Sequence, residues 1–224
     1  EIPGLSSFAQ RVLGCLVEKE ALTPEAYPLS LNGVVVACNQ KTAREPVMEV
    51  GEGSAYQALR ELETRGLARR IEAPRTTKWR HLVREAWSLE APELAVLALL
   101  LLRGPQTSGE IRNRSERLHT FHTPEEVEAS LARLSQTENV LVRDLGRGPG
   151  QKEGRWAHAL GPAGERSKTP TVEEAELPSA VSRGAESDRT TEELARRLSD
   201  LEERVSRIEQ ALGRRDSHEM KDYD

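Results

Sequence analysis

Apolar residues recur at helical spacing in several separate stretches of this chain. Residues three or four positions apart lie on one face of a helix, so each stretch predicts an amphipathic helix with one buried side. The stretch Leu94–Leu102 is apolar at all nine positions and predicts a helix that is buried all round. The other apolar stripes are Phe8, Val12, Leu13, Leu16 and Val17; Val34 to Cys38; Leu59 with Leu62; and Leu131 with Leu134.

Residues with capping chemistry mark where several of these helices begin and end. A Ser or Thr followed three positions later by Glu predicts a capping box, and a Gly after an apolar stripe predicts a left-handed C-terminal cap. Proline at the first helical position also indicates a start, because its missing N–H would have no partner there. The predicted caps are Pro28 or Ser30; Thr107 with Glu110; Thr123 with Glu126, and Pro124 after the threonine; and Gly66 with Leu67 folding back.

The stretches 55–83 and 126–160 repeat the same order of features. Each begins with an amphipathic helix and continues with two short strands around a basic or Gly/Pro-containing turn. Each ends with a basic residue, Trp, one further residue and His. Two more predicted helices precede each repeat. Three helices followed by a β-hairpin form a winged helix, a helix-turn-helix variant whose third helix can enter the major groove of DNA.

The predicted fold class is therefore mainly α with small β-hairpins (α+β). It consists of two tandem winged-helix domains followed by a linker and a C-terminal coiled-coil helix. The 224 residues, of which 37% are apolar, are enough to build two small cores. The predicted segments are a first winged-helix domain at 1–88, a second at 89–162, a flexible linker at 163–188, a coiled-coil helix at 189–215 and a disordered end at 216–224.

Four segments of the chain carry a resemblance to a known family. They read "RVLGCLVEK", "TPEAYPLSLNGVVVACNQKTAREPV", "LLLLRGPQTSGEIRNR" and "RWAH". In these segments the chain resembles the YceH-like bacterial proteins, a tandem winged-helix family of uncharacterised function, over about residues 5–160. The resemblance implies the fold and brings no known substrate or ligand. It also implies Asn before Arg44, where this chain has Ala43.

Several classes of protein fit this sequence poorly. The apolar run between Glu93 and Arg103 has nine residues, whereas a helix that crosses a bilayer needs about 20. The two cysteines, Cys15 and Cys38, form neither a disulfide framework nor a CxxC metal pair. We therefore expect a reduced, cytoplasmic protein without a membrane partner, a cofactor or a metal.

The charge distribution indicates where a polyanion would bind. The net charge is −5, but residues 161–224 hold 11 basic and 16 acidic residues, so the preceding 160 are balanced. Within that balanced part, residues 67–84 hold six basic side chains and one acid, Glu72. This basic patch falls on the first predicted hairpin and favours contact with DNA phosphates.

Helix geometry then selects the predicted DNA contacts of the first domain. Side chains opposite the buried Leu59 and Leu62 face the groove, and Glu61 among them is expected to repel phosphates. The predicted contacts are Lys41, Arg44, Arg75, Lys78 and Arg80 to phosphates, and Gln57, Arg60 and Thr64 to bases. In the second domain the outward positions are Glu125, Glu126, Ala129, Arg133 and Gln136, whose acidic end is unsuited to reading DNA.

The polar cluster from Asn39 to Arg44 allows two interpretations. Asn tolerates left-handed backbone, and basic side chains complement a helix C-terminus, so the cluster is compatible with simple helix termination. Residues 40–52 are nevertheless longer than a helix-turn-helix turn, so the cluster can also bind a phosphate or a protein. Cys38 with His81 is the only hint of a nucleophile and base and lacks a third group, so we predict no catalytic residues.

The tail carries a second repeating pattern. From Leu194 the apolar residues step by four and three positions, which is a heptad seam with Arg at g and Glu at e. We predict parallel self-association into a homodimer, the alternative being a helix that packs on its own chain. The predicted seam residues are Leu194, Leu198, Leu201, Val205, Ile208 and Leu212.

Two functions remain in competition. One is a non-enzymatic DNA-binding protein that acts through the first domain, as in a transcriptional regulator. The other is a protein-protein interaction scaffold with no direct DNA contact, which the neutral charge of residues 1–160 favours. A fold alone does not decide between them.

Overall fold

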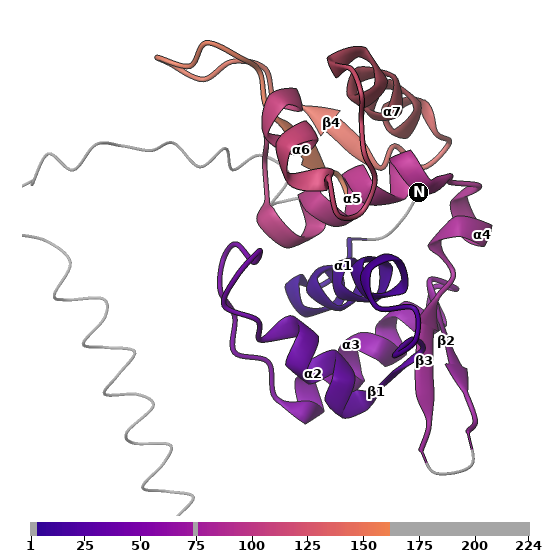
Figure 1. Ribbon diagram of the computed structural model, residues 1–224. Helices are drawn as coiled ribbons and strands as arrows, with labels where there is room; N and C mark the ends of the chain where they lie inside the picture. Colours follow the sequence, from indigo (N-terminus) through magenta and orange to yellow (C-terminus); the bar gives the residue numbers. More distant parts are fainter. Residues whose placement is uncertain (1–3, 74–75, 162–224) are drawn as a thin grey trace, which may run out of the picture. The chain divides into compact units, whose positions relative to one another are not determined.

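The computed structural model describes residues 4–73 and 76–161 (Figure 1). Within these residues the elements follow one another as α1 Ser7–Leu22, β1 Leu29–Ser30, α2 Leu31–Cys38, α3 Glu52–Thr64, β2 Ala68–Ile71, β3 Lys78–His81, α4 Val83–Trp87, α5 Ala91–Arg103, α6 Ser108–Ser115, α7 Pro124–Gln136, β4 Val142–Asp144 and β5 Trp156–His158. We call α1–α4 with β1–β3 the first half, and α5–α7 with β4–β5 the second half. The fold is mainly helical with small antiparallel sheets, as predicted, and is compatible with a winged helix.

Most predicted helix ends are confirmed by their hydrogen bonds. Ser30, rather than Pro28, begins α2, because its hydroxyl accepts the Gly33 N–H at 3.2 Å. Thr107 and Glu110 form the reciprocal bonds of a capping box. After α3, Gly66 takes the left-handed φ of 69° that favours glycine, and the Leu67 N–H reaches back to the Leu62 carbonyl at 2.8 Å.

The capping box predicted at Thr123 is wrong, although α7 does begin with Pro124 as predicted. The Thr123 side chain accepts no hydrogen bond from the first turn. The Glu126 carboxylate instead accepts the N–H of His122 at 2.8 Å, one residue before the expected donor. The N-cap backbone also differs between the two helices, with φ of −128° at Thr123 and −77° at Thr107.

Both predicted hairpins form antiparallel sheets. In the first half β3 lies between β1 and β2, and Trp79 of β3 faces Leu29 of β1 and Arg70 of β2. In the second half β4 pairs with β5, with Asp144 opposite Trp156. The β2–β3 hairpin projects beyond the helices of its half (Figure 1).

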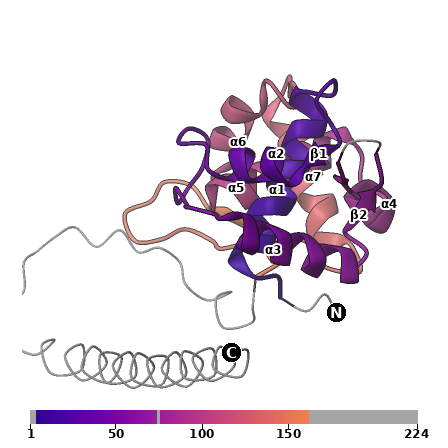
Figure 2. The same cartoon turned by 90° about the horizontal axis from the view of Figure 1, so that it is seen from below.

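One hydrophobic core runs through both halves. It includes Leu13 and Leu59 from the first half together with Leu97 and Leu131 from the second. Helix α1 packs on α5 at Gly14, where an added Cβ would lie only 3.0 Å from side-chain atoms of the opposite helix. Seen from below, α3 lies in front of α1 (Figure 2), so α1 is covered on both sides by helices. None of the helices in the described ranges is long and apolar enough to cross a bilayer.

Candidate nucleic-acid interface

Helix α3 presents one exposed face, and all three predicted base-contacting residues lie on it. Gln57, Arg60 and Thr64 are exposed at spacings of three and four, while Leu59 and Leu62 on the opposite side are fully buried. Arg60 forms an ion pair with Glu63 along the helix. The Gln57 side chain makes no hydrogen bond to any described residue, so its amide points into solvent with its donors and acceptor unused.

Glu61 does not lie in the middle of this face, contrary to the prediction. Its carboxylate turns to the start of α1, where it accepts the Ser6 N–H at 3.1 Å and the Ser6 hydroxyl at 2.6 Å. Arg65 lies 3.1 Å from the same carboxylate. The expected repulsion of phosphates is therefore reduced, because the negative charge is already compensated within the chain.

The register of the β2–β3 hairpin sorts its side chains onto two faces. Alternate residues of a strand point to opposite sides, and directly paired residues share a side. Trp79 and His81 are buried on the inner face. The outer face carries Lys78, Arg80 and the residue paired with Arg80, which is Arg69. The prediction did not include Arg69 in the site. Pairing the two strands of the hairpin in the sequence would have placed Arg69 opposite Arg80, on the same face.

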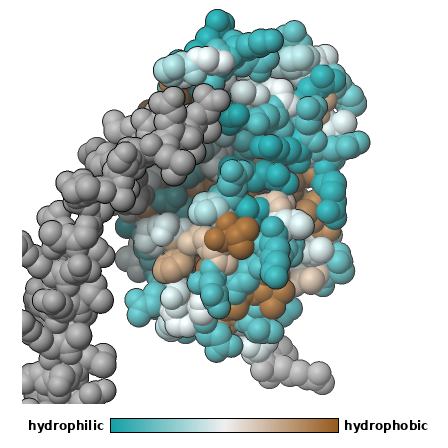
Figure 3. Space-filling view, turned by 90° about the vertical axis from the view of Figure 1, so that its left-hand side faces the viewer, coloured by the Kyte–Doolittle hydropathy of each residue, from teal (hydrophilic) through white to brown (hydrophobic). Residues whose placement is uncertain are grey.

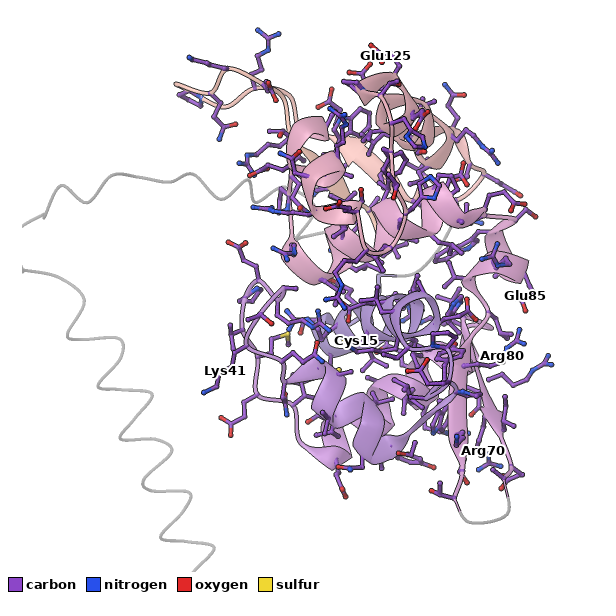
Figure 4. All side chains as sticks on the ribbon, viewed as in Figure 1. Cys15, Lys41, Arg70, Arg80, Glu85 and Glu125 are labelled. Carbon is purple, nitrogen blue, oxygen red and sulfur yellow. The ribbon has the colours of Figure 1, made fainter. Side chains whose placement is uncertain are left out.

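The basic residues of the hairpin differ in how strongly they are paired. Arg80 forms an ion pair with Glu85 of α4 (Figure 4), and Arg70 lies 3.3 Å from Glu72. Arg69 is exposed and has no ionic partner among the described residues. Predicted contact Arg75 lies outside the described residues.

An aromatic contact joins the hairpin to α3. Tyr56 meets the buried Trp79 edge to face, with ring centroids 6.5 Å apart. Tyr56 is 45% exposed and lies next to Gln57 on the helix. Helix α3 therefore adjoins the β2–β3 hairpin on the side of Trp79.

Two predicted contacts do not belong to this surface. Lys41 is exposed, but it lies on the side of the first half away from the hairpin that carries Arg70 and Arg80 (Figure 4). Arg44 is buried, and its side chain has no exposed area. The prediction that Arg44 contacts phosphate is wrong for this structure, because a phosphate cannot reach the guanidinium.

Arg44 instead holds the α2–α3 loop against the core. Its guanidinium donates to both carboxylate oxygens of Glu18, at 3.0 and 2.5 Å, and to the Ala37 carbonyl at the end of α2. Gln40 accepts a further bond from Arg44 at 3.0 Å. A second buried arginine, Arg11, donates to the Pro46 carbonyl at 2.6 Å. The polar cluster is therefore mainly structural, and it stabilises an irregular loop rather than only a helix end.

The loop is also fixed at its two ends and at its middle. Asn39 bonds both backbone groups of Val50, accepting its N–H at 2.7 Å and donating to its carbonyl at 2.9 Å. The Glu45 N–H donates to the Leu102 carbonyl of α5 at 2.8 Å. Asn39 itself has φ near −88° and is not left-handed. The left-handed residue is Ala43, with φ of 58°, at the position where the family resemblance implies Asn.

The sequence contained a signal for this buried network that the prediction did not use. Arg11, Cys15 and Glu18 are spaced by four and three positions along α1, so they form a polar line on an otherwise apolar helix. All three are buried. Arg11 and Arg44 carry two positive charges against the single negative charge of Glu18, so this buried network has an excess of positive charge.

The two cysteine thiols lie in this positive environment. Burial alone raises the pKa of Cys15, but a hydrogen bond from the Cys38 thiol and the charge of Arg44 outweigh it and hold the pKa below its ordinary value. The same hydrogen bond, together with burial, raises the pKa of Cys38. The hydrogen bond between the two thiols therefore shifts their pKa values in opposite directions.

His81 cannot act as a base toward Cys38, since both of its ring nitrogens are engaged. Nε2 lies 2.9 Å from the Glu20 carboxylate, and Nδ1 accepts the Val83 N–H at 3.2 Å. Its backbone N–H donates to the Tyr27 hydroxyl at 2.7 Å. Burial lowers the pKa of His81 despite the attraction of Glu20. His81 therefore anchors the hairpin to α1 as a neutral side chain.

The second half offers a less suitable surface for DNA. The residues predicted to face outward on α7 are all exposed, and Glu125 and Glu126 lie in its first turn. Arg133 is bound to the buried carboxylate of Glu93 at 3.1 Å. The exposed start of this helix is therefore acidic, as predicted.

The geometry defines a class of protein: a mainly helical α+β chain, compatible with a winged helix, in which an exposed helix face adjoins a basic hairpin. The family model described as "Protein of unknown function, DUF480" matches residues 5–151. A UPF0502 protein of Stenotrophomonas maltophilia (strain K279a) is 44% identical over 214 residues, covering 95% of this chain and 94% of its own.

Other relatives carry the same family name. A UPF0502 protein of Pseudomonas fluorescens (strain Pf0-1) is 40% identical over 93% of this chain and 95% of its own. One from Azotobacter vinelandii is 50% identical over 68% of each chain. The chain therefore belongs to the DUF480 family of UPF0502 proteins, and the resemblance to the YceH-like proteins is confirmed.

Proposed function

We propose that this protein binds duplex DNA without enzymatic activity, through the exposed face of α3 and the outer face of the β2–β3 hairpin, in transcriptional control. In this proposal each half is a winged helix, divided between residues 88 and 89, and the first half makes the main contact. Gln57, Arg60 and Thr64 approach base edges in the major groove. Arg69, Lys78 and Arg80 approach phosphates, and Arg75, outside the described residues, stays a predicted phosphate contact.

The observation that supports this proposal best is the alignment of three basic side chains on the outer face of the hairpin. Arg69 and Arg80 are paired across the two strands, where like charges destabilise a sheet. Arg80 already pairs with Glu85, but Arg69 and Lys78 have no counter-ion among the described residues. Phosphates along a DNA strand can supply such counter-ions. The compensated charge of Glu61 removes the main electrostatic objection on the neighbouring helix.

Salt-dependent binding to a random duplex tests the proposal. Fluorescence anisotropy at several NaCl concentrations measures the slope of log K against log salt. We expect a slope of about −2.7 to −4.5, because about three to five phosphates are neutralised and each contributes about −0.9. The double variant Arg69→Glu/Lys78→Glu should reduce the affinity at least tenfold, since two attractive contacts become repulsive.

A matched control comes from the second hairpin. Arg147 and Lys152 are exposed on the β4–β5 hairpin, and their reversal to Glu changes the net charge by the same amount. This control should retain its affinity. Equal loss in both variants would show that binding depends only on net charge, and no binding by the wild type at low salt would exclude the DNA proposal.

A protein-interaction scaffold is the second candidate, and exposed apolar side chains favour it. Val36 of α2 and Val47 of the following loop are each 59% exposed. The side of the molecule that carries these elements shows apolar atoms among hydrophilic ones (Figure 3). If the random duplex does not bind, Val36→Ser and Val47→Ser are the variants to compare in a pull-down from lysate. If a protein captured by the wild type is not captured by either variant, the result favours the scaffold.

The predicted seam from Leu194 to Leu212 lies outside the described residues. We propose that residues 189–215 form a parallel two-stranded coiled coil joined to the body by the linker at 163–188. A dimer would present two first halves to one duplex, which raises the effective concentration of the second contact.

A further inference from the structure

Two adjoining hollows lie where the α2–α3 loop meets the second half. The larger has a volume of ≈ 450 Å³ and the smaller ≈ 100 Å³. Glu18, Leu22, Ala43 and Arg117 line both, so the two hollows lie next to each other. Pockets of about 300–1,000 Å³ are the usual size of small-molecule sites.

The lining of these hollows is strongly basic. It contains five basic side chains and a single carboxylate. The carboxylate, Glu18, is held by Arg44 on both oxygens and by Lys19 at 3.4 Å, so it leaves the other four basic groups without its charge. The basic side chains are Lys19, Lys41, Arg103, Arg114 and Arg117.

Among these basic side chains, Arg103 has a buried donor, Nε, without a hydrogen-bond partner among the described residues. Two of the carbonyls that end α5 already accept other donors, Leu99 from Gln106 and Leu102 from Glu45. Burial, and then the like charges of Arg114 and Arg44, lower the pKa of Arg103. A bound anion would relieve both costs.

The neighbouring cations are available to the same anion. Lys41 and Arg117 form no ion pair or hydrogen bond with any other residue in the described ranges. Arg114 donates to the Gln106 side chain at 2.9 Å, and its distance to Glu110 is a loose 3.6 Å. The apolar wall formed by Leu22, Leu99, Leu102 and Leu118 would cover a non-polar part of the ligand.

We propose that these hollows bind a small phosphorylated molecule whose phosphate or diphosphate group lies among Arg103, Arg114 and Arg117. Guanidinium groups bind phosphate oxygens through strong, charge-assisted hydrogen bonds. The site uses side chains from α1, α5, α6 with the segment after it, and the α2–α3 loop, and none from the proposed DNA surface. It is therefore a ligand site separate from that surface, and its test does not depend on DNA binding.

Isothermal titration of the full chain with pyrophosphate at low salt tests the site. We expect measurable binding by the wild type and at least tenfold weaker binding by Arg103→Gln/Arg117→Gln, since each lost charge-assisted bond accounts for about tenfold. Arg117→Gln alone removes an exposed side chain, so it tests the site without threatening the fold. The matched control Arg147→Gln/Lys152→Gln should bind as the wild type does.

Further arms separate the sources of binding. ADP should bind at least as tightly as pyrophosphate, and adenosine should bind much more weakly, because the phosphates provide the recognition. The wing variant Arg69→Glu/Lys78→Glu should keep its pyrophosphate affinity even if it no longer binds duplex. The proposal is overturned if the wild type gives no binding heat, if Arg117→Gln binds as the wild type does, if adenosine matches ADP, or if the wing variant loses pyrophosphate.

Discussion

Replacing Arg44 by Met would test whether the polar cluster is structural. The Arg44 side chain has no exposed area, and its guanidinium donates to Glu18, to the backbone carbonyls of Ala37 and Ala43, and to Gln40. Methionine keeps much of the volume but removes every donor. The Glu18 carboxylate, with a side chain only 8% exposed, would then keep Lys19 as its remaining ionic partner among the described residues.

The expected loss of stability follows from that geometry. Removing one partner of a buried ion pair costs about 3–5 kcal/mol, because an uncompensated charge stays buried. Lys19 lies 3.4 Å from Glu18 and offsets part of the cost, so we expect about 3 kcal/mol. A typical domain is stable by about 5–15 kcal/mol, so this variant would fold with a small margin.

Urea denaturation followed by circular dichroism measures this loss. With an m value of about 2 kcal/mol/M, the midpoint should fall by about 1.5 M. The double variant Glu18→Leu/Arg44→Met should be more stable than Arg44→Met, since it no longer buries a lone carboxylate. Lys41→Met, an exposed substitution in the same loop, is the control and should change stability by less than about 0.5 kcal/mol. A loss below about 1 kcal/mol for Arg44→Met would refute the structural role.

Three further outcomes are expected. Ala43→Gly should stabilise the chain by about 1 kcal/mol in the same titration, because glycine adopts a φ of 58° without strain, and a destabilised variant would contradict this. Burial and then Arg143 lower the pKa of His158 to about 4, so the unfolded chain binds its proton first as the pH falls. Between pH 6.5 and 4 the wild type should thus lose about 2–3 kcal/mol more than His158→Gln, and parallel losses would argue against it. In sedimentation, the full chain should have twice the mass of a monomer and a chain ending at residue 188 should not, with Leu198→Cys cross-linking between chains; equal masses would exclude the coiled coil.

Local features of the fold were predictable because their causes lie within a few residues. The Ser30 cap, the Thr107 capping box and the Gly66 ending each depend on hydrogen bonds within about one helical turn. The two hairpins were found because the same order of residues occurs twice. The capping box predicted at Thr123 did not form because the N–H of His122, one residue earlier, donates to the Glu126 carboxylate instead.

Contacts between distant residues were not predictable in the same way. Arg44 bonds Glu18, 26 positions away, and Glu61 bonds Ser6, 55 positions away. In the sequence Arg44 was interpreted as an exposed charge after a helix and Glu61 as an exposed charge on one, because nothing local shows which partner a long side chain will find. As a result the prediction placed Arg44 on the DNA surface and Glu61 in its path, whereas Gln57 and Arg60 were placed correctly on an exposed face.

The backbone bond between Glu45 and Leu102 affects how this sequence can drift over evolutionary time. A bond between an amide and a carbonyl does not depend on the side chains, so the exposed Glu45 can be replaced by any residue that keeps its N–H, whereas Leu102 is also constrained by its burial in the core. The number of residues between Asn39 and Val50 is constrained, because the Asn39 side chain forms hydrogen bonds with both backbone groups of Val50. An insertion or a deletion between these residues would break the hydrogen bonds between Asn39 and Val50 and would move the loop away from α5. Among relatives, the length of this segment should therefore stay constant while exposed positions such as Lys41 and Thr42 change.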